Sequence, residues 1–96
     1  MARRIIWSSR ASDEKIEIFK FWNQHNKSKA YSRRLNRLFN EAVEILKNHP
    51  FIGRPTNIEN VHVKIVLNYL IVYQVRPDEI IIIRIWDGRR DPNDMP

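Results

Sequence analysis

Two arginines next to the end of an apolar run are the residues of this chain best suited to chemistry. The run from Ile80 to Ile85 leads into Trp86-Asp87-Gly88, and Arg89 and Arg90 follow. Branched apolar residues predict a buried strand, and a rigid strand end holds a charged side chain in a fixed place. Gly88 allows a sharp turn after the strand, so both arginines are expected to project into solvent. The pair is therefore a candidate site for a polyanionic target. The alternative is a surface arginine that pairs with a neighbouring aspartate and contributes little to stability.

Lys64 and Arg84 are candidates for a second, positively charged site on a face of a sheet. Arg84 stands between Ile83 and Ile85, so in a strand its side chain faces away from both. Lys64 alternates with branched apolar residues and predicts a strand with one polar face. The alternative is a solvated strand face without function. His62 shares this polar face, but no carboxylate lies at a spacing that would make it a general base.

Composition excludes several other kinds of site. The chain has no cysteine, and its three histidines lack the spacing of metal ligands, so we expect no metal site and no cofactor. Gly53 and Gly88 are the only glycines, which excludes a glycine-rich phosphate loop. No apolar run reaches the length of a membrane span, and the basic N-terminus lacks the apolar segment of a signal peptide. These features predict a soluble, cytoplasmic protein without a membrane partner.

The chain is basic, with a formal net charge of +6, which favours a polyanionic partner. Arg33, Arg34 and Arg37 follow closely on Lys29, with no acid among them. They fall in the first half of a predicted helix, where the helix dipole disfavours cations, so local energetics would not select them. We therefore interpret these three arginines as a binding surface for an acidic partner, either a protein segment or nucleic acid. The alternative is that Arg37 pairs with Glu41, the others are solvated, and the basic composition serves only solubility.

The elements that would position these residues follow the order β-α-α-β-β-β in a single domain, residues 1–96. Ile5-Ile6-Trp7 predicts the first strand. Ser12 is the expected N-cap of the first helix, and its inner face carries Ile16, Phe19 and Trp22.

A second, amphipathic helix is predicted from Ser28, its expected N-cap, to about Asn48, because a residue before proline disfavours the helical conformation. The short link between the two helices makes them an antiparallel hairpin. The expected inner face of the second helix consists of Tyr31, Leu35, Leu38, Ala42 and Ile45.

Three strands are predicted near the C-terminus, at 61–65, 69–75 and 79–86, with short turns between them. Tyr69, Ile71, Tyr73 and Val75 alternate along the second of these strands, so we expect their common face to form core. Consecutive strands with such short connections form an antiparallel meander. Residues 91–96 contain two prolines and no periodicity, so we expect an extended tail. The predicted fold class is α+β, with the helical hairpin packed on one face of a small antiparallel sheet.

Several short motifs occur together in this order. They are the helical hairpin, Pro50-Phe51-Ile52-Gly53-Arg54-Pro55 after it, Asn68 to Val75, and Ile83 to Asp91. Each motif alone is unspecific, but together they cover nearly the whole chain. In this combination the chain resembles the RelE/ParE superfamily of toxins from bacterial type II toxin–antitoxin systems. The resemblance implies that superfamily's fold and a cognate antitoxin as partner, in a homo-oligomer or a hetero-oligomer with the antitoxin.

Leu70 bears on the activity that the resemblance implies. RelE-like toxins cut messenger RNA on the ribosome and typically have an arginine directly after the tyrosine that opens the third strand. Here Leu70 follows Tyr69, and a leucine does not stabilise charge on a phosphate. ParE-like toxins inhibit DNA gyrase without cutting RNA, and they commonly have a Gly-Arg-Pro loop and an apolar residue at this place. The chain is therefore more similar to the ParE-like members, which are not enzymes.

The resemblance also implies roles for the basic residues. Arg89, Arg90 and Arg84 are expected to contact the target, and the three arginines of the second helix are expected to contact the antitoxin. One alternative is a RelE-like, metal-independent endoribonuclease that acts on mRNA in the ribosome. In that case Arg90, Arg84 and Lys64 would stabilise charge at the scissile phosphate. The other alternative is a toxin-derived binding module without toxicity.

Overall fold

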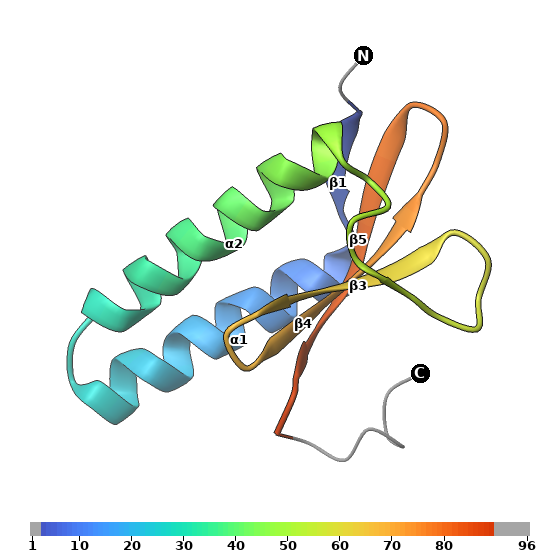
Figure 1. Ribbon diagram of the computed structural model, residues 1–96. Coiled ribbons are helices and arrows are strands. Elements are labelled where there is room, and N and C mark those ends of the chain that lie inside the picture. The colour runs from blue at the N-terminus through green and yellow to red at the C-terminus, as the bar shows by residue number, and fades with distance from the viewer. Residues whose placement is uncertain (1–2, 90–96) are drawn as a thin grey trace.

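The computed structural model describes residues 3–89 of the chain. Within them, two helices form a hairpin against a five-stranded sheet, which confirms the predicted α+β class (Figure 1). The elements in chain order are β1 (Arg4–Trp7), α1 (Ser9–Asn26), α2 (Ala30–Asn48), β2 (Arg54–Pro55), β3 (Val61–Val66), β4 (Tyr69–Val75) and β5 (Glu79–Asp87).

The sheet is mixed, whereas the sequence predicted an antiparallel one. Its strand order is β1-β5-β4-β3-β2, and β3, β4 and β5 form the expected antiparallel meander. β1, however, runs parallel to β5, with Trp7 opposite Ile82. After the hairpin the chain lies again beside the start of β1, where the N–H of Arg3 donates to the carbonyl of Lys47. The chain then reverses between β3 and β4 and again between β4 and β5, so β5 runs in the same direction as β1. The two-residue strand β2, which was not predicted, pairs with β3.

Helix α1 begins earlier than the predicted N-cap at Ser12. The N-cap is Ser8, whose Oγ accepts the N–H of Ala11 at 3.0 Å and donates to the carbonyl of Ile83 at 2.8 Å. Because Ser8 bonds to the helix and to strand β5 at once, it fixes the helix start against the sheet. Ile16, expected on the inner face, is 50% exposed, whereas the other two expected inner residues do pack against the core.

Helix α2 ends at Asn48, as predicted, but its start and inner face differ in detail. Lys29 is the N-cap and has no capping side-chain bond, while the Oγ of Ser28 accepts the N–H of Ala30. Ile45, expected inside, is exposed. The inner face is therefore rotated relative to the predicted one. The buried residues of α2 are Ser32, Leu35, Phe39, Ala42, Val43 and Leu46.

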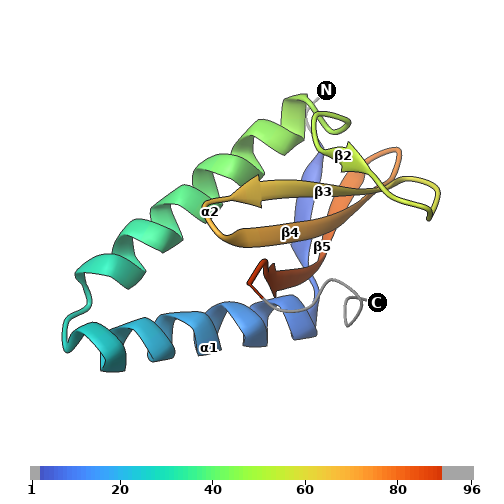
Figure 2. The ribbon, with the colours of Figure 1, turned by 60° about the horizontal axis from the view of Figure 1, so that its bottom comes forward.

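The core lies between the helical hairpin and one face of the central strands. In Figure 2 the helices diverge from their connecting turn, and the sheet fills the opening between them. The alternate residues of β4 that were predicted to form core are buried, and they share a face with three isoleucines of β5. These buried residues are Tyr69, Ile71, Tyr73, Val75, Ile80, Ile82 and Ile85.

The loop after α2 is attached to the core through the hydroxyl of Tyr73. The Tyr73 Oη donates to the carbonyl of Pro50 at 2.8 Å and accepts the N–H of Gly53 at 3.0 Å. A Cβ at Gly53 would lie 2.6 Å from this oxygen, so no larger residue fits without a shift. The glycine of the Gly-Arg-Pro motif is therefore required for close packing. Burial raises the pKa of Tyr73, which keeps the hydroxyl protonated as a donor.

Candidate partner-binding surfaces

Arg84 is buried, although the sequence placed it on an exposed face of the sheet. The pairing register of β4 and β5 shifts after Val72, so that Val72 lies opposite Arg84 but Tyr73 lies opposite Ile82. Ile83 is the additional residue of this β-bulge, which changes the alternation along the strand. Arg84 is only 6% exposed. Both interpretations from the sequence, a positively charged face and a solvated face, are therefore wrong for this residue.

The partner of Arg84 is Glu14, near the start of α1. The Glu14 Oε2 accepts hydrogen bonds from Arg84 Nη2 at 2.7 Å and from Nε at 3.2 Å. The guanidinium also lies over the ring of Trp86, 4.6 Å from its centroid. The sequence analysis missed this role of Glu14. The available signal was an arginine inside an apolar strand, because a buried cation requires a paired acid.

Glu14 also replaces a neighbouring strand at the outer edge of β5. The pairing of β1 with β5 ends at Ile82, which leaves the following backbone groups of β5 without a strand beside them. The Oγ of Ser8 donates to the carbonyl of Ile83, and the Glu14 Oε1 accepts the N–H of Ile85 at 3.0 Å. The Glu14 carboxylate thus accepts hydrogen bonds both from the backbone at the edge of β5 and from the buried arginine. Glu14 and Arg84 are therefore parts of the fold and unavailable to a target.

Lys64 and Arg84 do not share a face of the sheet, contrary to expectation. Lys64 lies opposite Ile71 and Arg84 lies opposite Val72. Neighbouring residues of a strand point to opposite faces, so the two basic side chains are on opposite sides. Arg90, the third residue considered for an endoribonuclease, lies outside the described residues. The structure therefore does not bring Lys64 and Arg84 together at one site.

His62 takes part in aromatic packing. Its ring lies 5.8 Å from that of Tyr73 in a stacked arrangement and 5.4 Å from that of Phe51 in an edge contact. Its Nδ1 is buried and makes no hydrogen bond within residues 3–89.

Within residues 3–89, no group of three or more acids and histidines is arranged to hold a metal ion. None of the described helices has both the length and the apolar character needed to cross a membrane.

Arg89 folds back onto the chain, whereas the sequence predicted that it would project freely. Its Nε and Nη2 donate to the two carboxylate oxygens of Asp87 at 3.0 and 2.9 Å. Its guanidinium lies 5.7 Å from the centroid of the Trp22 ring. The hydrogen bonds that Arg89 donates to the Asp87 carboxylate raise the pKa of Arg89, which therefore remains charged. The side chain is still 50% exposed and presents this charge at the surface. Its predicted neighbour Arg90 lies outside the described residues.

Two contacts fix the chain around Arg89. The Trp22 Nε1 donates to the Tyr69 Oη at 2.7 Å, which ties the second half of α1 to the start of β4. The N–H of Gly88 donates to the carbonyl of Asn68 at 2.7 Å, and a Cβ at Gly88 would lie equally close to that oxygen. Gly88 is therefore required by this close approach. The backbone that carries Arg89 is therefore held against the turn before β4.

A hollow of about 340 Å³ lies beside Arg89, between α1 and the end of β5. Ile18, Phe21 and Trp86 contribute apolar surface to it, and its charged lining residues are Glu14, Glu17, Asp87 and Arg89. An apolar side chain of a partner fits such a lining, with a polar group at the rim. We name Arg89 and this hollow the β5 tip.

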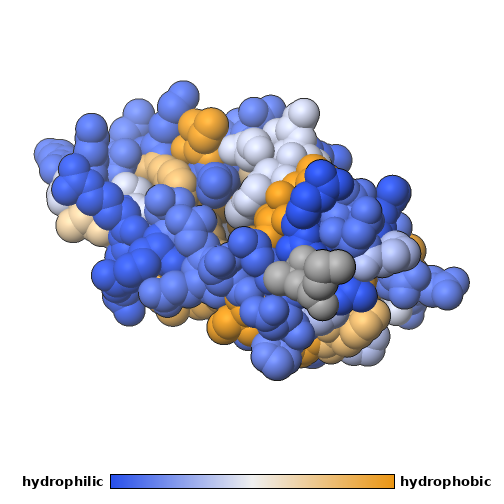
Figure 3. All heavy atoms as spheres, turned by 90° about the horizontal axis from the view of Figure 1, so that it is seen from above, coloured by the Kyte–Doolittle hydropathy of each residue, from blue (hydrophilic) through white to orange (hydrophobic). Residues whose placement is uncertain are grey.

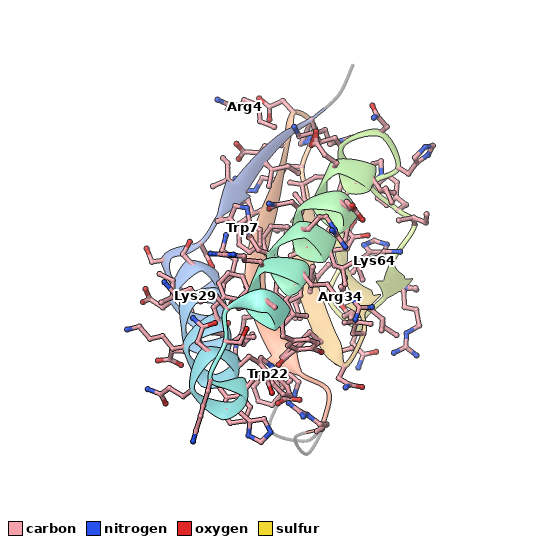
Figure 4. The ribbon with its side chains drawn as sticks, turned by 90° about the vertical axis from the view of Figure 1, so that its left-hand side faces the viewer. Arg4, Trp7, Trp22, Lys29, Arg34 and Lys64 are labelled. Carbon is pink, nitrogen blue, oxygen red and sulfur yellow. The ribbon has the colours of Figure 1, made fainter. Side chains whose placement is uncertain are left out.

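The three arginines of α2 are exposed, as the sequence predicted. Arg37 lies 3.9 Å from Glu41, with side chains that are 67% and 63% exposed, so this ion pair contributes little. Arg33 and Arg34 make no ion pair within residues 3–89. Figure 4 shows Arg34 on α2 and Lys29 at the start of the same helix. The cluster is therefore free to bind an acidic partner, which is what its interpretation as a binding surface requires.

Comparison with known proteins gives one family and a similar solved structure. A sequence model of the ParE toxin of type II toxin–antitoxin systems, parDE, matches residues 5–92. A solved structure described as the chromosomal ParDE TA system from P. aeruginosa aligns with a TM-score of 0.74 and 18% sequence identity. The alignment covers 88% of this chain and 94% of that chain. At this identity the likeness shows a common fold. No curated protein matches the sequence.

Proposed function

Because the chain belongs to the ParE toxin family of type II toxin–antitoxin systems, we propose that it inhibits growth by acting on DNA gyrase and that a cognate antitoxin neutralises it. The observation that carries this proposal is the family match over residues 5–92, which includes the helical hairpin and Arg89. Leu70, at the position where RelE-like toxins have an arginine, supports gyrase over messenger RNA as the target. Action on gyrase would take place in the cytoplasm.

The positions of the basic residues also favour a toxin that is not a nuclease. Stabilising the charge of a phosphate during cleavage needs several cations around the same atom. Lys64 and Arg84 lie on opposite faces, and Arg84 is neutralised by Glu14 at 2.7 Å. These two residues therefore do not supply the cations that the endoribonuclease alternative assigned to them.

We place the contact with the target at the β5 tip. Arg89 is charged and half-exposed, and two hydrogen bonds to Asp87 hold its guanidinium. A rigid cation loses little conformational entropy on binding, which favours affinity. The adjacent hollow offers apolar contact area beside the charge. Arg90, which follows directly in the sequence, is proposed to add a second charge there.

The antitoxin is proposed to bind the cluster of Arg33, Arg34 and Arg37 and an edge of the sheet. Exposed guanidinium groups bind carboxylates through paired hydrogen bonds. The edges are formed by the short strands β1 and β2, whose outer backbone groups are available to an extended segment. An antitoxin segment with acidic residues would match both features.

Two assays on the purified chain test the choice of target. Supercoiling of relaxed plasmid by gyrase is expected to fall as the protein is added. Messenger RNA on translating ribosomes is expected to stay intact, as measured by primer extension. The variant Arg89→Ala with Arg90→Ala serves as the control and is expected to leave gyrase active. Cleavage of mRNA in the decoding site would overturn the assignment to gyrase, and activity in neither assay would favour the non-toxic binding module.

A further inference from the structure

The positive charge of the chain is concentrated around the turn of the helical hairpin. The segment from Ile18 to Asn40 contains six of the 17 lysines and arginines and none of the eleven acids. The remaining eleven basic residues are matched in number by the eleven acids, so this segment carries the whole net charge of +6. Its basic residues are Lys20, Lys27, Lys29, Arg33, Arg34 and Arg37.

These cations are exposed, and carboxylates do not neutralise them. Of the six, only Arg37 forms an ion pair within residues 3–89, the weak one with Glu41. Figure 3 shows that the end of the molecule with the hairpin turn, on the left, is largely hydrophilic. Unpaired cations that gather at one end of a small protein create a positive potential there, which attracts polyanions.

Two lysines of the turn occupy positions that local energetics would give to other residues. Lys27 is the C-cap of α1 and has a φ of 50°, a left-handed conformation in which glycine or asparagine is favoured. Lys29 is the N-cap of α2, where the helix dipole disfavours a cation, and its own side chain makes no capping bond. Residues that conflict with local preferences in this way are typical of functional sites.

An exposed aromatic pair lies just before this turn. Phe21 is 52% exposed, and its ring stacks on that of His25 with 5.6 Å between centroids and 11° between planes. Trp22 contacts both rings with its edge, at 5.0 and 5.4 Å, and is itself held by its bond to Tyr69. The Phe21–His25 pair is therefore a preformed, solvent-accessible aromatic surface next to unpaired lysines.

We propose that the hairpin turn binds single-stranded nucleic acid. Lys20, Lys27 and Lys29 neutralise phosphates, and Phe21 with His25 stacks on an unpaired base. Exposed aromatic rings among cations are the combination with which proteins bind single strands without sequence preference. An acidic protein would use the lysines but not the ring, and an intact duplex offers no base face for stacking. The inference does not depend on gyrase as the target.

The test measures the affinity of the purified chain for a short fluorescent oligo-dT by anisotropy over a range of salt concentrations. Phe21→Ala is expected to weaken binding about 5- to 100-fold at every salt concentration, because it removes stacking. Lys27→Gln with Lys29→Gln is expected to reduce the slope of log K against log salt by about 1.4, since each phosphate contact on a single strand contributes about 0.7. The same DNA as a blunt duplex is expected to bind more weakly than the single strand.

Matched controls use exposed residues outside the segment. Arg10→Gln with Arg54→Gln changes the net charge equally, and Ile16→Ala removes an exposed apolar side chain from the same helix. Both controls are expected to leave the affinity within about twofold, a free-energy change below about 0.5 kcal/mol. Equal weakening by the two double variants would show that only net charge matters. Equal binding of the duplex, or unchanged affinity in Phe21→Ala, would likewise overturn the proposal.

Discussion

Glu14 and Arg84 lie 70 residues apart in the sequence and form a partly buried ion pair with 2.7 Å between Oε2 and Nη2. The pair joins the first turns of α1 to the strand β5 just after its bulge. Since the other Glu14 oxygen accepts the N–H of Ile85, the same side chain completes the edge of the sheet. Arg84, which the sequence made a candidate for contact with a phosphate, therefore has a structural role in this fold.

Glu14→Gln is therefore expected to lower the free energy of unfolding by about 3 kcal/mol, because it leaves a buried guanidinium without its countercharge. Urea denaturation measures this change. Glu17→Gln, on the exposed side of the same helix, is the control and is expected to stay within about 0.5 kcal/mol of the parent. A loss below about 1 kcal/mol in Glu14→Gln, the value typical of a surface pair, would show that water screens this ion pair.

Tyr73→Phe is expected to destabilise the fold by about 1–3 kcal/mol, because it leaves the carbonyl of Pro50 and the N–H of Gly53 without their partner. The effect also depends on pH. Burial raises the pKa of Tyr73 above its ordinary value of 10.0, so its contribution is fully present below that pH and is lost as the pH rises through the folded-state pKa. Unfolding curves at rising alkaline pH should therefore converge for the parent and Tyr73→Phe. A constant difference between the two proteins across this range would contradict the assignment.

Much of the fold follows from local patterns in the sequence. Alternation predicted that Tyr69, Ile71 and Tyr73 are core, and these residues are buried. The proline at position 50 predicted the end of α2, which ends at Asn48. Such features depend on neighbouring residues alone, so a single sequence contains them.

The errors concern features that depend on distant residues. Ser8 and Ser12 are equally good N-caps by type, and the choice falls to Ser8 because its hydroxyl also reaches Ile83. The alternation rule placed Arg84 on a solvated face because it cannot see Glu14, a residue of α1 whose carboxylate pairs with the guanidinium. The same limit applies to Arg89, whose fold-back depends on Trp22 in α1.

Replacing Arg33, Arg34 and Arg37 together by glutamate is expected to weaken the complex with the antitoxin and to flatten its dependence on salt. The reason is that these exposed guanidinium groups supply long-range attraction to acidic residues, which salt screens. Titration calorimetry or surface plasmon resonance at low and high salt measures both effects.

The matched control for this cluster changes three exposed basic residues elsewhere, Arg10, Lys20 and Arg76, to glutamate. It produces the same net charge without touching α2. If this control weakened the complex as strongly as the α2 variant, the antitoxin would respond to net charge only. Unchanged affinity of the α2 variant at both salt concentrations would remove the cluster from the interface.

Arg89→Ala with Arg90→Ala is expected to abolish growth inhibition while the protein remains folded. The bond of Arg89 to Asp87 is half-exposed and contributes at most about 1 kcal/mol, whereas a core truncation costs about 2–5 kcal/mol. Growth after induction and the midpoint of thermal unfolding measure the two effects separately, with Arg10→Ala as the control for loss of a surface charge. An unfolded double variant would make the arginines structural, and a stable, fully toxic one would move the target contact away from the β5 tip. Because Arg89 is already clamped by Asp87 and Trp22, a loss of toxicity without a loss of stability would show that the fold holds this charge for the target.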